Sequence, residues 1–243
     1  MSFPIFFGLD LNNPLTMAGY ALAGASPSVL ALIFVFRYEG KEYRYAFIKR
    51  IIRFDAISLK GYVFIFLFVP VVSLVSLLAE YLVSAIPPDW SAWCSYTKNP
   101  LNFLFFAVST FILGPLAEEI GWRGYLFDHL SGKGPMAYGL GLGFLWTIWH
   151  MPMFFIVGTY QNGLFERGAI PVICFAVSTT ALGIILGALV IRNQKSILAA
   201  ILFHFMINFT GELVPLTDAG ELFQAGIYLI SSVLILKIKL CIR

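Results

Sequence analysis

Long apolar runs, separated by short polar segments, make up most of this chain. A transmembrane helix needs about 20 mostly apolar residues, and most of the seven longest runs approach or exceed that length. Pro70 and Pro152 interrupt two of them, and Pro87-Pro88 ends the second. The pattern predicts an all-α fold, a polytopic membrane bundle of about seven transmembrane helices. The runs cover residues 14–36, 61–86, 101–127, 136–157, 170–191, 196–214 and 222–236.

The densest group of charges lies between the first two apolar runs. Residues 37–60 hold seven basic and three acidic side chains, a net charge of +4, which predicts a cytoplasmic loop with a helix at the membrane surface. With the N-terminus outside and the C-terminus cytoplasmic, fourteen of the sixteen Lys and Arg residues fall on the cytoplasmic side. These include Arg123, Lys237, Lys239 and Arg243. We expect the loop to contact anionic lipid, and we assign it no nucleic-acid binding.

Composition narrows the class of protein. Hydrophobic residues make up 59% of the 243 residues and charged residues only 12%, against roughly 25% charged in soluble domains. We expect one membrane domain over residues 1–243, because seven spans leave no room for a separate soluble domain. The start of the chain lacks the features of a cleaved signal peptide, so the first span is expected to stay as an anchor. Cys94, Cys174 and Cys241 have no metal-type spacing, and a disulfide between Cys94 and Cys174 stays open.

Three charges lie inside the third run, within Gly114–Gly124. A charged side chain near the bilayer centre costs about 2.5–3.5 kcal/mol on insertion scales, so this cluster needs a compensating role. Glu119 and Arg123 are four residues apart on one helix face, and we predict that they pair. Glu118 points about 100° away around the helix, which leaves it as the carboxylate better placed to exchange a proton. Two interpretations stay open: a chemical site, or a structural ion pair where the helix meets water.

A histidine in the fourth run lies next to a helix breaker. His150 precedes Pro152 by two residues, and Pro152 cannot donate a hydrogen bond to the carbonyl of Ile148. We therefore expect a kink and a free carbonyl beside the histidine. A simple hydrogen bond from His150 to another helix is the alternative.

The sixth run carries a second histidine with an amide. His204 and Asn208 lie one helical turn apart and therefore share a face, either as chemical groups or as hydrogen-bonding links between helices. Measured from the cytoplasmic helix ends at 1.5 Å per residue, Glu118, His204 and His150 lie about 15, 12 and 20 Å deep. We therefore expect three helices to bring these groups together in the cytoplasmic half of the membrane.

Three motifs of this kind follow one another in order along the chain. They are Glu118-Glu119-Ile120-Gly121-Trp122-Arg123, Trp146 to His150, and His204 to Asn208. In these motifs the chain resembles the CAAX protease and bacteriocin-processing enzymes, intramembrane proteases related to the Rce1-type prenyl-protein endopeptidases, whose patterns are E-E-x-x-x-R, F-x-x-x-H and H-x-x-x-N. The resemblance covers about residues 100–210, and the spacing of Gly183 and Gly187 is also similar. Two features depart from the family: Trp146 replaces Phe, which is expected to alter the pocket wall but not the chemistry, and members often have eight spans.

The resemblance implies an endopeptidase that hydrolyses a peptide bond inside the membrane. It implies that Glu118, with His150, activates a water as general base, while His204 and Asn208 stabilise the oxyanion or help to bind a metal. Arg123 would hold the neighbouring carboxylate. Glu118, His150 and His204 match a catalytic zinc set in ligand type, and whether Zn²⁺ is bound stays open. The candidate site comprises Glu118, Glu119, Arg123, His150, His204 and Asn208.

Two functions of other classes also stay open. In a proton-coupled carrier, Glu118, His150 and His204 would form a relay, although the sequence has no visible internal repeat. In a non-catalytic immunity or secretion scaffold, the fold would persist without the activity. We expect the partners to be membrane lipids and a membrane-associated peptide or protein, of CAAX type or of bacteriocin or leader type. The expected location is a prokaryotic cytoplasmic membrane.

Overall fold

The computed structural model describes the backbone of residues 9–241 and the side chains of residues 9–237. Within that range the regular structure is helical, apart from one isolated β-bridge between Asp10 and Val157. This confirms the predicted all-α class. The side chains of Lys239, Cys241 and Arg243, which entered the predictions above, lie outside the described residues.

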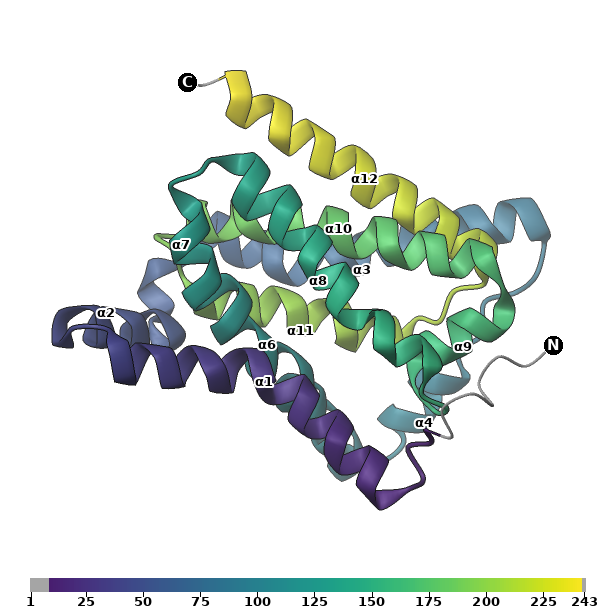
Figure 1. Ribbon diagram of the computed structural model, residues 1–243. Helices are drawn as coiled ribbons and strands as arrows, with labels where there is room; N and C mark the ends of the chain where they lie inside the picture. The colour runs from purple at the N-terminus through teal and green to yellow at the C-terminus, as the bar shows by residue number, and fades with distance from the viewer. Residues whose placement is uncertain (1–8, 242–243) are drawn as a thin grey trace.

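All seven apolar runs are helical in the structure, in the predicted order (Figure 1). The short helix α2 is the one expected in the charged loop, whereas α4 and α9 were not predicted. The α-helices are α1 (Pro14–Tyr38), α2 (Lys41–Ile52), α3 (Leu59–Ser84), α4 (Ser91–Thr97), α5 (Pro100–Phe111), α6 (Ala117–Glu119), α7 (Phe127–Ser131), α8 (Leu142–His150), α9 (Tyr160–Arg167), α10 (Ala169–Arg192), α11 (Ile197–Leu213) and α12 (Asp218–Cys241). Two 3₁₀ segments, η2 (Phe54–Ala56) and η6 (Met151–Phe155), and three π-helical segments, η3 (Ile112–Leu116), η4 (Ile120–Leu126) and η5 (Met136–Gly141), complete the set.

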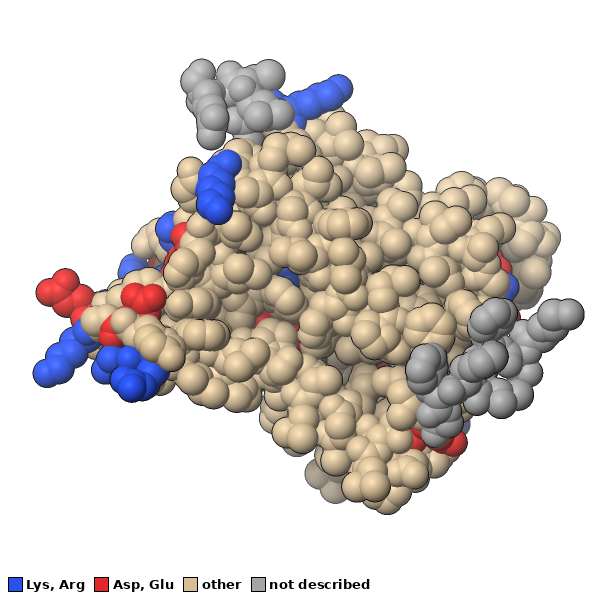
Figure 2. Space-filling model, in the orientation of Figure 1, with Lys and Arg blue, Asp and Glu red and all other residues tan. Residues whose placement is uncertain are grey.

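Five helices of the described chain have the length and apolar character needed to cross a membrane. They are α1, α3, the continuous helix Pro100–Ser131, α10, and Asp218–Lys237 within α12. The two remaining predicted spans are shorter: α11 has 17 residues, and the fourth run is divided among η5, α8 and η6. The face in Figure 2 is mostly uncharged between its two ends, as expected for a surface that contacts lipid.

Polar side chains set where several helices begin. The Oδ1 of Asn13 accepts a hydrogen bond from the Leu15 amide over 2.9 Å and starts α1. The hydroxyl of Ser196 accepts from the Ala199 amide over 3.1 Å and starts α11, and Ser58 caps α3 in the same way. Each cap satisfies a backbone donor that the first helical turn leaves without a partner. Short polar residues between the apolar runs therefore fix the starts of these helices.

Glycines allow α8, the helix that carries His150, and η5, which leads into it, to pack closely against α10. A Cβ atom placed on Gly183 would lie 2.2 Å from the Cα of Gly143, and one on Gly187 would lie 2.9 Å from the carbonyl oxygen of Tyr138. No side chain fits at either position, so the backbones of the two helices approach each other directly. The glycine spacing noted in the sequence thus positions a helix of the candidate site.

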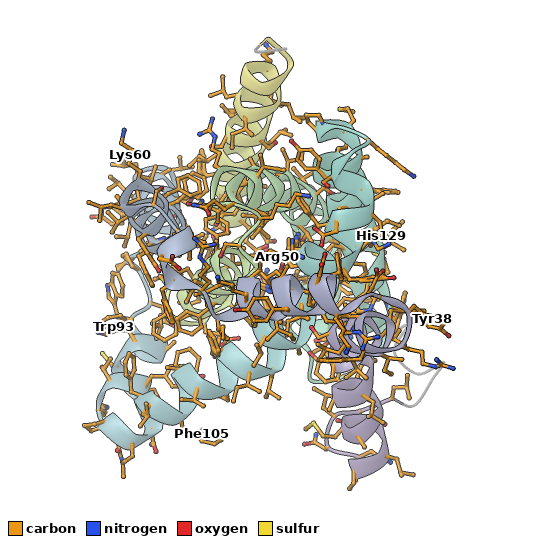
Figure 3. The ribbon with its side chains drawn as sticks, turned by 90° about the vertical axis from the view of Figure 1, so that its left-hand side faces the viewer. Tyr38, Arg50, Lys60, Trp93, Phe105 and His129 are labelled. Atoms are coloured by element: carbon orange, nitrogen blue, oxygen red, sulfur yellow. The ribbon has the colours of Figure 1, made fainter. Side chains whose placement is uncertain are left out.

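An ion pair and hydrogen bonds join the basic end of the molecule to the helix of the third predicted span. Figure 3 views this end, with α2 lying across it and Arg50 labelled. The Nη1 of Arg50 donates to Oδ1 of Asp128 over 2.8 Å, and the hydroxyl of Tyr43 donates to Oδ2 over 2.7 Å. Burial, with the hydrogen bond to Asp128, raises the pKa of Tyr43, so the phenol remains a donor. Arg50 thus forms an ion pair with the helix that carries the carboxylates, and Lys195 forms a longer one with the same Asp128.

Candidate active site

The two adjacent carboxylates lie in an irregular part of a long helix. The helix is continuous from Pro100 to Ser131, yet only Ala117–Glu119 winds as an α-helix between the π-helical segments η3 and η4. Pro115 lies in η3 and cannot donate a backbone hydrogen bond, which accounts for the break at that point. π-Helical turns inside α-helices frequently occur at functional sites.

Glu119 and Arg123 form the ion pair that their spacing predicts. The Nη1 of Arg123 donates to Oε1 of Glu119 over 2.8 Å, and both side chains are fully buried. Nδ1 of His204 lies 2.8 Å from the same oxygen. Because an ionised carboxylate only accepts, Nδ1 of His204 carries the proton in this bond. Arg123, which was counted above among the cytoplasmic charges, is thus buried within the protein and not exposed in a loop.

Glu118 turns toward a different side of the helix from Glu119, as predicted. Its Oε2 accepts a hydrogen bond from Nε1 of Trp146 over 2.7 Å, and the residue is buried on the wall of the central cavity. The ring of Trp146 also lies over the guanidinium of Arg123, with 4.3 Å between Cζ and the ring centroid. The replacement of the family's Phe by Trp146 therefore reaches the candidate base itself. We expected a change in the pocket wall; the structure adds this hydrogen bond, and the expectation that the chemistry is unaltered stays a prediction.

His150 is the last residue of α8, and a backbone carbonyl orients its ring. Nδ1 lies 2.7 Å from the carbonyl oxygen of Trp146, and since a carbonyl only accepts, Nδ1 carries the proton. The neutral ring then keeps its lone pair on Nε2. The helix tightens to η6 beside Pro152, but the carbonyl of Ile148 accepts from the amide of Met151. The expected free carbonyl is therefore absent here, because an i to i+3 bond satisfies it.

Helix α11 brings His204 and Asn208 to the same cavity, as their shared face predicts. The amide of Asn208 lies against the helix that carries the carboxylates. A Cβ atom at Gly114 would come within 2.7 Å of Nδ2 of Asn208. Glycine at this position therefore leaves room for the amide, a requirement that the sequence pattern did not reveal.

One cavity of about 840 Å³ collects the candidate groups. Glu118, His150, His204 and Asn208 line it, whereas Glu119 and Arg123 do not. The expected convergence of three helices is present, and Figure 1 shows α6, α8 and α11 close to one another in the middle of the bundle. Glu119 instead binds Nδ1 of His204 outside the cavity, and Arg123 binds Glu119. Away from these groups the cavity extends toward the end of the bundle opposite α2, where its lining includes Tyr160, Arg167, Glu212 and Glu221.

Neither a disulfide nor a metal-binding cluster occurs among the residues that the structure describes. Cys94 is exposed and Cys174 is buried, and both are free thiols. No three His, Cys, Asp or Glu side chains in the described part of the chain come close enough to hold a metal ion. Glu118, His150 and His204 suit zinc in ligand type, and the hydrogen bonds to Trp146 and Glu119 leave Oε1 of Glu118 and Nε2 of His204 available. In this arrangement, however, the three side chains do not form a group close enough to hold the ion.

Comparison with known proteins identifies relatives of the chain. The sequence profile of a family described as type II CAAX prenyl endopeptidase Rce1-like matches residues 100–210, which contain all six candidate residues. The chain is also 30% identical, over 220 residues, to the CAAX prenyl protease 2 of Methanococcus maripaludis. That alignment covers 88% of the chain and 79% of the archaeal protein.

Proposed function

This chain belongs to the Rce1-like family of type II CAAX prenyl endopeptidases, and we propose how it hydrolyses a peptide bond within the membrane. In this proposal Glu118 and His150 activate the attacking water, and His204 and Asn208 stabilise the oxyanion. One observation supports it above all: these four side chains line the same cavity, although they come from three separate helices. Family membership favours hydrolysis over the proton carrier and the non-catalytic scaffold.

Glu118 is the general base of the proposed reaction. The indole of Trp146 occupies Oε2, which leaves Oε1 as the oxygen that can accept a proton from a water in the cavity. Nε2 of His150 offers a second acceptor to that water, because Nδ1 already donates to a carbonyl. The water oxygen attacks the peptide carbonyl carbon as its proton moves to Glu118. The protonated Glu118 then delivers this proton to the amine that leaves.

His204 and Asn208 supply the donors for the oxyanion. Because Nδ1 of His204 binds Glu119, only Nε2 can reach a substrate, and it donates when the ring carries a second proton. The carboxylate of Glu119, which also accepts from Arg123, lies directly against this ring. Asn208 adds an amide N–H without any change of charge. Donors held ready in a buried site stabilise a developing oxyanion far better than the same donors in water.

Zinc is a separate question from this assignment. A catalytic Zn²⁺ would supply a Lewis acid and lower the pKa of its bound water. Its ligands would be Glu118, His150 and His204, but these side chains do not form a cluster that fits the ion. The proposed mechanism therefore assigns every proton transfer to side chains and none to a metal.

Removal of metal is expected to leave the peptidase activity unchanged. Activity would be measured before and after dialysis against a strong chelator, with the metal content of the same samples determined by elemental analysis. Activity with well under one metal per chain supports water activation by the side chains. Loss of activity on chelation, with recovery on addition of zinc, would show that the three ligands rearrange around the ion and would overturn this assignment.

The substrate is a membrane-associated peptide or protein, in keeping with the family. We propose a CAAX-type substrate anchored by a lipid on its cysteine, since the archaeal relative is named for prenyl protease activity. A leader-type peptide is the alternative. We also propose that the basic segment 37–60 contacts anionic lipid of a prokaryotic cytoplasmic membrane, and that nucleic acid is not a partner.

A peptide that ends in a farnesylated cysteine and three further residues is expected to lose those three residues. The purified protein would be reconstituted in liposomes, and products would be identified by mass spectrometry. The same peptide without the lipid should be cleaved poorly, because it does not partition into the membrane. Cleavage of a membrane-anchored leader peptide alone would move the assignment to that substrate class. Proton flux without cleavage of either peptide would contradict the peptidase function.

A further inference from the structure

Trp146 lies at the centre of the candidate site and contacts its charged and titratable groups. The residue is 3% exposed, and its Nε1 donates to Oε2 of Glu118 over 2.7 Å. Its ring packs on the guanidinium of Arg123. The imidazoles of His150 and His204 meet the ring edge to face, with centroids 5.5 and 5.0 Å away. One side chain therefore links the candidate base, the buried ion pair and both histidines.

The hydrogen bond to Glu118 depends on the indole nitrogen. The family motif has Phe at this position, and a Phe ring could pack against Arg123 and the histidines but could not donate. An indole N–H is a donor only, so it holds one oxygen of the carboxylate in place. The bond to His150 comes from the backbone carbonyl of Trp146 and does not depend on the side chain. The side chain thus acts chiefly on Glu118.

The contact between Trp146 and Glu118 is a hydrogen bond between two buried polar groups and not only a packing contact. A buried carboxylate oxygen or indole N–H without a partner costs free energy, and each group here satisfies the other. The neighbouring Trp122 shows the contrast: its Nε1 is buried and makes no hydrogen bond within the described part of the chain. Of these two tryptophans, only Trp146 has an indole N–H that binds Glu118.

We propose that Trp146 is a positioning residue for the reaction: its indole N–H holds Oε2 of Glu118 and keeps Oε1 directed at the water in the cavity. This inference depends on the proposed role of Glu118 as the base. The stacking of the ring on Arg123 fixes the indole plane from the other side and so fixes the direction of the N–H. The chain thereby orients its base with a contact that Phe at this position cannot supply.

Trp146→Phe is expected to lower kcat by about 10- to 100-fold and to leave KM unchanged. A base that rotates away from its water loses rate, because a misplacement of about 1 Å can cost about 100-fold. Substrate binding, which the rest of the large cavity supports, should change little. The matched control is Trp122→Phe, which removes an indole N–H that does not reach the base and should leave kcat as in the wild type.

A second variant separates the hydrogen bond from the packing. Trp146 would be replaced by 3-benzothienylalanine, which keeps the shape of the indole and has sulfur in place of N–H. We expect the same loss in kcat as for Trp146→Phe, with a melting temperature close to that of the wild type. Wild-type kcat in this variant, while Glu118→Gln is inactive, would overturn the positioning role alone. Full activity of Glu118→Gln would instead overturn the proposed function on which it depends.

Discussion

Glu118→Gln is expected to lower kcat by about 10²–10⁴-fold while the protein stays folded. Gln has the shape of Glu, and its amide oxygen can still accept the hydrogen bond from Trp146. It cannot take a proton from water, so the contribution of a general base is lost. The measurement is cleavage of a saturating membrane-anchored peptide in liposomes, with the melting temperature of the variant recorded in detergent.

The control for this variant is another carboxylate of the same cavity. Glu212 lines the cavity on α11, two helical turns beyond His204, and no hydrogen bond or ion pair joins it to another described residue. Glu212→Gln removes a comparable charge without touching the proposed base, and it should keep most of the activity. Equal activity of Glu118→Gln and the wild type would show that another group activates the water.

Arg123→Met is expected to destabilise the protein by about 3–5 kcal/mol. Removal of one partner from a buried ion pair leaves the other charge without compensation, and both Glu119 and Arg123 are fully buried. Met keeps most of the length of the Arg stem, so the effect comes from the charge more than from a cavity. Unfolding in detergent, followed by heat or denaturant, should show the loss directly.

The double variant Glu119→Gln with Arg123→Met tests the cause. With both charges removed, no buried carboxylate is left without a counter-charge, so this variant should be more stable than Arg123→Met alone. The exposed pair between Arg53 and Asp55 offers a control, and Arg53→Met should leave unfolding unchanged. A wild-type melting curve for Arg123→Met would mean that the ion pair does not hold the site together.

The candidate zinc ligands show what residue types alone can predict about a metal site and what they cannot. One carboxylate and two imidazoles from three helices have the composition of a catalytic zinc set. A metal site also requires donor atoms that come together around one point. Oε1 of Glu118 and Nε2 of His204 are available, but the three side chains do not form a group close enough to hold an ion. Composition could not reveal how these side chains are spaced in the packed structure.

The hydrophobic pattern was sufficient for the helices and for part of the site. A helix satisfies its own backbone groups over four residues, so the apolar runs are enough to place α1, α3, α10 and α12, and polar residues cap the first two of these helices. The same local geometry pairs Glu119 with Arg123 and puts His204 and Asn208 on one face. Short segments with weaker patterns, such as α4 and α9, were missed.

Contacts between helices could come only from the packed structure. Trp146 contacts Glu118, which is 28 residues away in the sequence, and His204 contacts Glu119, which is 85 residues away. Which side chains meet depends on how far each helix is rotated and how closely it packs, and the π-helical turns beside Glu118 and the backbone contact at Gly183 set both. Local periodicity carries no information on these quantities. Helix geometry predicts that Glu118 and Glu119 point in different directions, but which of them lines the cavity follows from tertiary packing.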